Sequence, residues 1–402
     1  MTLKNLSRDI LRVMGVFAVA AICAPAVAPT FAPVFAKEPA SAGVADSATN
    51  LATDSATDSA TDSATLATNT ATVLTSVSPK NLNEGVRLKV LSYNIHGLPS
   101  PLRSKTTPLF ERIAEILRTR RQEGSQPEVV LLQEAFDGDA RVIADTTGYR
   151  YVLKGPGRKD NSEKGRAHWV PQSRKTYASF SDPQKFIGSG LYILSDYPIV
   201  KAQHKVFDSD MCAGYDCLSN KAILMASIEV PGVSVPVDII NSHFNSQRSA
   251  KAPSKHVFRA HQRQTDTLSW FMKKLCGSSP AIVAGDFNTK QRERYDYFRA
   301  TLPLIDAAED CLGTEGVCRL DESTPKGQVL YNTNDKHFFQ ASGGYLIKPV
   351  YMVRNFNEEL DGRELSDHLG YEVEYRITPQ LVKPARAAEP AQAQGQSSWA
   401  SR

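Results

Sequence analysis

Polar residues of the kinds used in hydrolytic sites recur where apolar stretches of this sequence end. They are Asn94, Glu134, His243, Asp286, Asn288, Asp367 and His368. A single residue of this set would more often be a solvated or structural residue at the rim of a sheet. Their repetition at strand-like ends is better explained by a site, because ligands of α/β folds bind at the carboxyl ends of strands.

The residue types indicate metal-assisted chemistry. Mg²⁺ prefers carboxylate and amide oxygens as ligands, and Glu134 and Asn94 supply them. An aspartate and two histidines can deprotonate water and bind or protonate phosphoryl oxygens. No serine-centred G-x-S-x-G turn accompanies these residues. The types alone therefore favour metal-assisted hydrolysis of a phosphate ester.

Alternating strands and helices must position these side chains. Apolar periodicity predicts strands in 87–94, 127–136, 188–199, 221–244 (two strands around Pro231-Gly232), 281–288 and 370–377. It predicts helices over 108–122, 259–277 and 293–303. Hairpins alternate with single helices, so an all-parallel sheet does not fit. We expect an α/β (α+β) fold of two mixed sheets packed face to face, with helices outside.

The ends of the chain do not resemble globular structure. Residues 1–36 combine a basic start, an apolar run and the cleavage-like Val34-Phe35-Ala36, which predicts a signal peptide. A membrane anchor is the alternative, but the apolar run is short of the ~20 residues a spanning helix needs. Residues 37–84 repeat Ala-Thr-Asp-Ser without an aromatic residue, which predicts a disordered stalk. One domain is expected over 85–378, followed by a disordered tail over 379–402.

Charge and cysteine content fit an exported protein, either periplasmic or extracellular. Without residues 1–36 the formal net charge falls from +4 to +2, which is too weak to indicate nucleic-acid binding by itself. An oxidising compartment favours disulfides, and Cys212 with Cys217, and Cys311 with Cys318, could each close a small loop. Cys276 would remain free at a helix end. A zinc site is the alternative, but no histidine lies at ligand spacing beside these pairs.

Several motifs, in this order, resemble the endonuclease/exonuclease/phosphatase superfamily. They are LSYNIHG, LLQEAF, GSGLYILSDYPI, NSHFNSQ, AGDFNTK and LSDH, spread over residues 90–368. The resemblance implies a deoxyribonuclease-like four-layer αββα sandwich. It also implies that Glu134 binds a catalytic Mg²⁺, or another divalent cation, with help from Asn94.

The same resemblance implies roles for the remaining residues. His243 would contact the phosphate, and Asp286 and Asn288 would position and activate the attacking water. Asp367 would contact the metal or orient a histidine. His368 would act as an acid or base or as a phosphate ligand.

A narrower resemblance, to bacterial secreted sphingomyelinases, lies in the stretch CAGYDCLSNKAILMASI. It would place Asn220 and Lys221 near the substrate phosphate, since lysine is a common phosphate partner. Alternatively, these two residues only cap a strand. The segment FRAHQRQ also looks like the Arg-x-x-Gln helix start of those enzymes.

Two stretches depart from the family pattern. The family carries Asp-Tyr/His-Ile-Phe before Ser-Asp-His, whereas here Lys336 stands where the aspartate is expected and Asp335 lies one residue earlier. The partner that orients His368 is therefore open, and Asp335 would need a local bulge to reach it. The expected hairpin HFFQASGGYLIKPVYMV carries aromatics in its arms, where we expect them in the core rather than in a membrane.

Three functions follow for a monomer without an obligate protein partner. The first is a secreted phosphodiesterase acting on a phospholipid head group, like sphingomyelinase. The second is a secreted nuclease, which the basic, aromatic insert 155–180 and the basic residues between Arg248 and Arg263 keep open. The third, a non-catalytic binding module, is disfavoured by the complete residue set.

Overall fold

The structure is a computed structural model that describes residues 85–380, apart from 100–101, 137, 161–184 and 314–316. All of these residues belong to one unit of the chain, Val73–Arg402. The predicted signal peptide and stalk lie outside the described residues, as do the tail beyond residue 380 and most of the basic insert.

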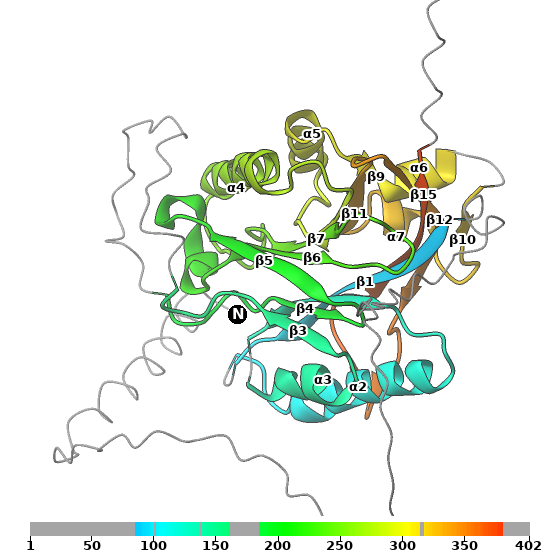
Figure 1. Cartoon of the computed structure of the whole chain (residues 1–402). Coiled ribbons are helices and arrows are strands. Elements are labelled where there is room, and N and C mark those ends of the chain that lie inside the picture. The colour runs from blue at the N-terminus through cyan, green and yellow to red at the C-terminus, as the bar shows by residue number, and fades with distance from the viewer. Residues whose placement is uncertain (1–84, 100–101, 137, 161–184, 314–316, 381–402) are drawn as a thin grey trace, which may run out of the picture. The chain divides into compact units, whose positions relative to one another are not determined.

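Two mixed β-sheets form the centre of the molecule (Figure 1). The seven-stranded sheet has the order β10-β12-β15-β1-β2-β4-β3, and the six-stranded sheet has the order β5-β6-β7-β8-β11-β9. The first consists of β1 (Val86–Gly97), β2 (Val129–Ala135), β3 (Tyr151–Lys154), β4 (Tyr192–Ser195), β10 (Arg319–Leu320), β12 (Tyr345–Asn355) and β15 (Gly370–Pro379). The second consists of β5 (Ile199–Val206), β6 (Ala222–Ile228), β7 (Val237–His243), β8 (Ala281–Asp286), β9 (Ile305–Asp306) and β11 (Asp335–Gln340). A small ribbon pairs β13 (Glu359–Leu360) with β14 (Arg363–Glu364).

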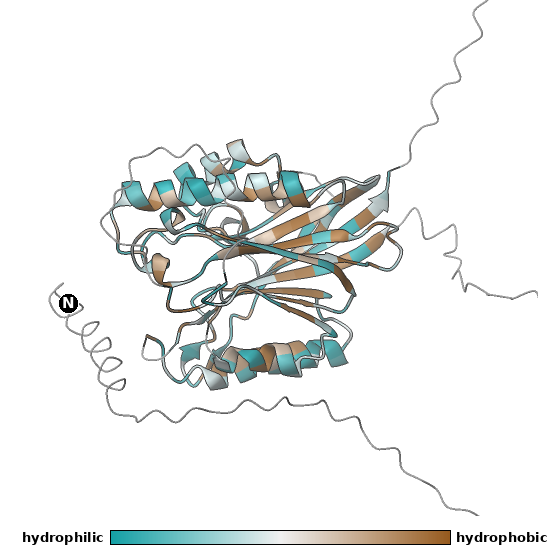
Figure 2. Cartoon of the chain, turned by 60° about the vertical axis from the view of Figure 1, so that its left-hand side comes forward, coloured by the Kyte–Doolittle hydropathy of each residue, from teal (hydrophilic) through white to brown (hydrophobic). Residues whose placement is uncertain are grey.

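Helices cover the outer faces of the sheets, so that four layers result (Figure 2). The longer helices are α2 (Thr107–Gln122), α4 (Ser254–Leu275) and α5 (Arg292–Thr301). The shorter ones are α3 (Arg141–Thr146), α6 (Ala307–Gly313) and α7 (Lys326–Leu330), with 3-10 turns η1 (Gly138–Ala140), η2 (Ser209–Met211) and η3 (Gly214–Leu218). The expected αββα sandwich is confirmed.

Three apolar clusters separate the layers, and strand alternation explains them. In β1, Leu88 and Val90 enter the cluster between the sheets, whereas Leu91 and Tyr93 enter the cluster under α2. In β7, Ile239 faces the other sheet and Ile240 packs under α4. Each strand thus presents every second side chain to the space between the sheets.

The expected hairpin over 337–353 is wrong in its pairing. Its first arm, β11, belongs to the six-stranded sheet, and its second arm, β12, pairs with β15 in the other sheet. The chain therefore crosses between sheets at the Gly343-Gly344 turn. The aromatics do lie in the core, as expected, since Phe338, Phe339 and Tyr345 are buried.

Both expected disulfides are present. Cys212 is bonded to Cys217 and Cys311 to Cys318, while Cys276 is free and buried. The zinc alternative for these pairs is therefore wrong. Within the described residues, no helix has the length and apolar character needed to cross a membrane.

Candidate active site

The predicted site residues meet where the two sheets face each other at one edge. Asn94 ends the inward face of β1, beside β2. In the other sheet, His243 of β7 is aligned with Asp286 of β8, and Asp286 is aligned with Asp335 of β11. Parallel β1 and β2, and parallel β7 and β8, bring their carboxyl ends to the same edge. The site is therefore assembled from both sheets.

Residues in the left-handed backbone region lie near the ends of three of these strands or just beyond them. Their φ angles are 50° for His96, 54° for Glu134 and 53° for Asn288. Such angles are uncommon in residues other than glycine and concentrate at functional sites. In β2, alternation alone would direct Glu134 toward α2, the side that Leu132 faces. The left-handed turn instead brings its carboxylate to Asn94.

Asn94 connects the two carboxylates of the site. Its Nδ2 donates to Glu134 Oε1 at 3.1 Å and to Asp286 Oδ2 at 3.0 Å. His243 Nε2 lies 3.8 Å from Glu134 Oε1 and 3.5 Å from Asp286 Oδ2. Burial raises the pKa of Glu134 to about 7 and also raises the pKa of Asp286. Two carboxylates thus converge where solvation alone does not support both charges.

This donor set fits a hard divalent cation. Single ligand atoms of Glu134, His243 and Asp286 lie within 4.8 Å of one another, and so do those of Asp286, Asp335 and His368. Carboxylate oxygens that converge in this way are suited to Mg²⁺. In the present orientation Asn94 offers its amide nitrogen to the carboxylates, because its Oδ1 accepts from the His96 backbone N–H at 3.0 Å. A role as metal ligand requires the amide to turn over.

Asp335 orients His368 without a bulge. Its carboxylate oxygens lie 3.0 and 3.1 Å from His368 Nδ1, and Arg354 Nη2 donates to the same carboxylate at 3.0 Å. Asp335 is aligned with Asp286 in an unbroken ladder. The expected local bulge is therefore wrong: Asp335-Lys336-His337-Phe338 fits the family pattern with its aspartate first and its phenylalanine fourth.

Strong electrostatic coupling fixes the charge state of this pair. Burial alone would lower the pKa of His368, but the charge and hydrogen bond of Asp335 raise it to about 10. Burial alone would raise the pKa of Asp335, but His368 and Arg354 hold it well below its usual range. At neutral pH, His368 therefore carries a proton on each ring nitrogen. Its Nε2 lies 3.8 Å from Asp286 Oδ2, facing the site.

Lys336 points away from the site. Its Nζ donates to the carbonyl oxygens of Val329 and Leu330 and lies 4.0 Å from Asp306 Oδ2. The Tyr295 ring centroid is 4.9 Å from the same nitrogen. Alternation along β11 thus separates Asp335 and Lys336, and a direct phosphate contact by Lys336 does not fit this position.

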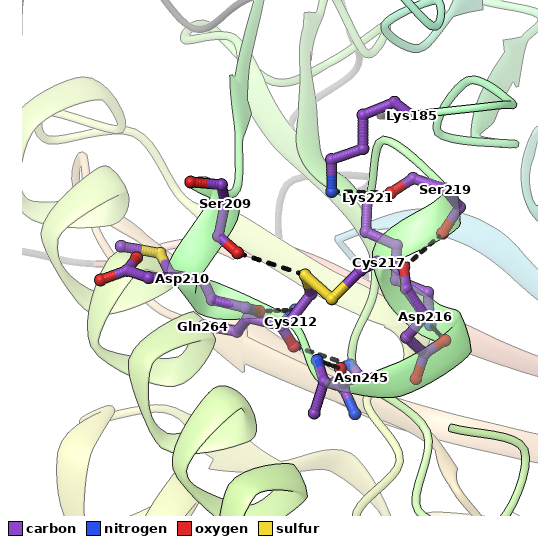
Figure 3. Close-up of a disulfide and its surroundings, with 12 residues drawn as sticks. Lys185, Ser209, Asp210, Cys212, Asp216, Cys217, Ser219, Lys221, Asn245 and Gln264 are labelled. Atoms are coloured by element: carbon purple, nitrogen blue, oxygen red, sulfur yellow. Dashed lines mark hydrogen bonds and ion pairs between the residues drawn. A yellow bond between two sulfur atoms is a disulfide. The ribbon is translucent and has the colours of Figure 1, made fainter. Parts of the chain in front are cut away.

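Lys221 lies at the site and is held by a residue that the sequence analysis missed. Its Nζ forms an ion pair with Asp216 at 2.7 Å, donates to the Phe244 carbonyl at 2.7 Å and lies 3.2 Å from His243 Nε2. Figure 3 shows that the Cys212–Cys217 disulfide closes the loop carrying Asp216. Burial and Lys221 lower the pKa of His243, which favours a neutral imidazole.

Other predicted residues lie at the edge of this cluster. Asn220 Nδ2 donates to the carbonyls of Gly157 and Asp160 and so fixes the position of the loop that contains these two residues. Asp367 is exposed and pairs with His96, Oδ1 to Nδ1, at 3.1 Å. Asn288 donates its backbone N–H to Asp286 Oδ1 at 3.0 Å.

A buried arginine of α5, also missed, supports the loops after β7 and β8. Arg294 Nη1 donates to the carbonyls of Asn245 at 2.8 Å and Asn288 at 3.1 Å. His96 was visible as part of the first motif, but its pairing with Asp367 was not. Asp216 could have been noticed as the acidic residue inside the predicted disulfide loop, whereas Arg294 gave no signal.

Comparisons with known proteins found solved structures that are similar to this chain. A solved structure of SmcL has 15% sequence identity and a TM-score of 0.50, covering 72% of this chain and 99% of that one. Sphingomyelinase C from Streptomyces griseocarneus has 20% identity and a TM-score of 0.49, with coverage of 72% and 99%. D. rerio TDP2 complexed with a single-strand DNA product has 16% identity and a TM-score of 0.48, and the match also covers 72% of this chain and 99% of that one.

At such identity the likeness to SmcL supports the fold alone. No curated protein sequence matches the chain. The model of the endonuclease/exonuclease/phosphatase family matches residues 91–347, which is more than half of the sequence and contains most of the site. The chain belongs to the endonuclease/exonuclease/phosphatase family.

Proposed function

We propose that this protein is an exported, Mg²⁺-dependent phosphodiesterase that hydrolyses the phosphodiester of a phospholipid head group. Members of its family hydrolyse phosphodiesters and depend on divalent metal ions. The observation that carries the proposal is the convergence of Asn94, Glu134, His243 and Asp286 from two sheets at 3.0 to 3.8 Å. Two disulfides among the described residues support an oxidising compartment.

Each side chain has a role in the proposed reaction. Glu134 would hold Mg²⁺, with Asn94 after its amide turns over, and the bound ion would stabilise charge on the phosphoryl oxygens. Asp286, whose pKa is raised by burial, would accept a proton from the attacking water, and Asn288 would orient that water.

The His368 side chain, whose Nε2 lies 3.8 Å from Asp286 Oδ2, would serve the leaving group. His368 would donate the Nε2 proton to the departing oxygen, and Asp335 would hold the imidazole in place. His243 and Lys221 would contact the phosphate. Water adds its oxygen to phosphorus, and the bond from phosphorus to the leaving oxygen breaks.

Two exposed aromatic residues favour an amphiphilic substrate. Phe186 donates its backbone N–H to Leu218 O, and Tyr215 directly precedes Asp216. Their exposed fractions are 49% and 43%. Tyr215 lies within the disulfide loop that holds Lys221, and Phe186 contacts the residue after that loop, so an acyl chain or a membrane surface would approach here.

A nuclease is the second candidate, and surface charge favours it. Arg248, Lys251 and Lys255 are exposed after β7 and at the start of α4, and Lys290 and Arg292 are exposed after β8. These positions follow the strands that carry His243 and Asp286. The phosphates of a nucleic-acid backbone could pair with these lysine and arginine side chains.

Parallel assays would distinguish the two substrates. The full chain with Mg²⁺ is given sphingomyelin vesicles, phosphatidylcholine vesicles, plasmid DNA and a soluble chromogenic phosphodiester. We expect hydrolysis of a phospholipid, and a loss with the Phe186→Ser/Tyr215→Ser double variant on vesicles but not on the soluble diester. Cleavage of DNA alone would replace the lipid assignment by the nuclease, and no cleavage of any substrate would refute phosphodiesterase activity.

A further inference from the structure

A layer of neutral polar side chains lies between the two sheets, next to the proposed catalytic residues and between them and the aliphatic core. On the inward face of β1, Ser92 precedes Asn94, and on β2 Gln133 follows Leu131. On β7, Asn241 lies between Ile239 and His243. Ser92, Gln133 and Asn241 are all buried, with exposed fractions of at most 1%.

Two amides in this layer join the sheets. Gln133 Nε2 donates to Asn241 Oδ1 at 2.8 Å, and Asn241 Nδ2 donates to the carbonyl oxygens of Leu132 and Tyr192, both at 2.9 Å. Gln133 Nε2 also lies 3.2 Å from Ser92 Oγ. One asparagine of the six-stranded sheet thus binds β2 and β4 of the other sheet.

The bridge is adjacent in sequence to both halves of the site. Gln133 precedes Glu134 and is aligned with Asn94 in the β1–β2 ladder. Asn241 lies two residues before His243, which is aligned with Asp286. Two distances across the site, from Asn94 to Asp286 and from Glu134 to His243, are each measured between residues of different sheets. A shift between the sheets would change these distances first.

Stability alone does not explain the amide bridge between Gln133 and Asn241. Gln133 Oε1 is buried without a hydrogen-bond partner among the described residues. An unpaired buried acceptor is unfavourable, whereas the aliphatic residues Leu131 and Ile239 at the preceding inward positions carry no such cost. Directional bonds can fix the sheet positions where nondirectional apolar packing does not.

We propose that Gln133 and Asn241 are positioning residues, which set the register of the two sheets and thereby the geometry of the metal-binding and phosphate-binding halves. The proposal deepens the proposed function and rests on it. A displacement of about 1 Å at a reacting centre can cost on the order of a hundredfold in rate. The two amides would act on turnover and metal affinity while touching neither substrate nor metal.

The test compares Gln133→Met, Asn241→Leu and their double variant with a matched control. The control is Ser227→Ala, which removes a buried 2.6 Å hydrogen bond to Asp238 that lies within the six-stranded sheet rather than between sheets. Mg²⁺ affinity is measured by calorimetry without substrate. The melting temperature, kcat and KM on the soluble diester are measured for every variant.

We expect each bridge variant to weaken Mg²⁺ binding roughly 10- to 100-fold, as for other residues that orient metal ligands. The kcat should fall similarly, with KM changed less than about threefold. The double variant should lose no more than about threefold beyond Asn241→Leu, because both changes break one bridge. Ser227→Ala should lower the melting temperature but leave affinity and kcat nearly unchanged.

Unchanged Mg²⁺ affinity and kcat in both bridge variants would overturn the proposal. Equal losses in Ser227→Ala would overturn it too, because destabilisation would then explain them. If Asn241→Leu does not fold, Asn241→Asp keeps the acceptor and removes both donated bonds, with the same expectation. Should the wild type neither bind Mg²⁺ nor cleave any diester, the proposed function fails first, and the inference resting on it fails with it.

Discussion

The space between the sheets has two halves that are built from the same strands. In the first half, inward positions carry aliphatic side chains such as Val90, Leu131, Ile239 and Ile282. In the second half, inward positions farther along these strands carry polar side chains: Ser92 and Asn94 on β1, Gln133 on β2, Asn241 and His243 on β7, and Asp286 on β8. The alternation of side chains does not change from one half to the other. Only the residue types change, so the first half stabilises the sandwich and the second uses it as a rigid support.

A large expected difference concerns two carboxylates of the β2 segment, that of Glu134 near the end of the strand and that of Glu128 just before its start. Glu134→Gln should lower Mg²⁺ affinity and turnover by more than about a hundredfold, since even residues that only orient metal ligands cost 10- to 100-fold. Excess Mg²⁺ should restore part of the activity, and EDTA should abolish that of the wild type. Calorimetry and steady-state kinetics measure both effects.

Glu128→Gln is the control for this change. Glu128 lies just before β2, and its carboxylate accepts a hydrogen bond from the Lys89 backbone at 2.7 Å. This variant should lose stability but neither metal affinity nor turnover. Retention of most activity by Glu134→Gln at limiting Mg²⁺ would show that the metal assignment is wrong.

The next comparison is between Asp335 and Lys336, which lie on opposite faces of β11, and Asp335 acts through His368. His368→Ala should reduce kcat on the order of 10²–10⁴-fold, as for loss of a general acid. Asp335→Asn should cost roughly ten- to a hundredfold, because it removes the group that orients His368. Kinetics on a soluble phosphodiester measure both.

Lys336→Met tests the opposite face of the same strand. Its ammonium is bound to carbonyls of α7 and lies near Asp306, so the melting temperature should fall while kcat and KM stay near those of the wild type. A raised KM in Lys336→Met together with wild-type turnover in Asp335→Asn would reverse the assignment of the two faces.

The sequence predicted the polar half better than it predicted the contacts within it. Asn94, Glu134, His243 and Asp286 could be found because each ends a strong apolar run, and strand ends share an edge. The partner of His368 could not be settled, because it depends on which face of β11 turns inward. The pairing of β11 was also missed, since a Gly-Gly turn does not reveal whether a chain folds back or crosses to another sheet.

A third comparison concerns the two disulfides. Cys212→Ser/Cys217→Ser should lower kcat/KM about tenfold, because the disulfide closes the loop that carries Asp216, and Asp216 holds Lys221 beside His243. Cys311→Ser/Cys318→Ser removes the other disulfide, which closes a loop of similar length, with a sequence separation of seven rather than five. This second loop takes no part in the contacts of Lys221. Each pair should cost about 2 kcal/mol of stability in the loop-entropy model.

The activity of the two cysteine variants is compared at a temperature where both are folded. Asp216→Asn should reproduce the loss of the first variant with both disulfides intact. Equal activity of both cysteine variants would show that the Cys212–Cys217 disulfide is not needed to position Lys221.

The smallest effect on catalysis is expected from the aliphatic half. Ile239 lies two residues before Asn241 on the same inward face of β7 and is fully buried. Ile239→Ala should cost about 2–5 kcal/mol of stability, because it leaves a cavity between the sheets. Aliphatic contacts are nondirectional, so neighbours can relax into part of this cavity while the Gln133–Asn241 bridge keeps the sheets in register. We therefore expect kcat and Mg²⁺ affinity within about twofold of the wild type below the melting transition, since the lost contacts are far from any reacting group. Thermal unfolding and kinetics on the same preparation measure both quantities. A tenfold loss of turnover in Ile239→Ala would show that sheet spacing, and not the amide bridge, determines the geometry of the site.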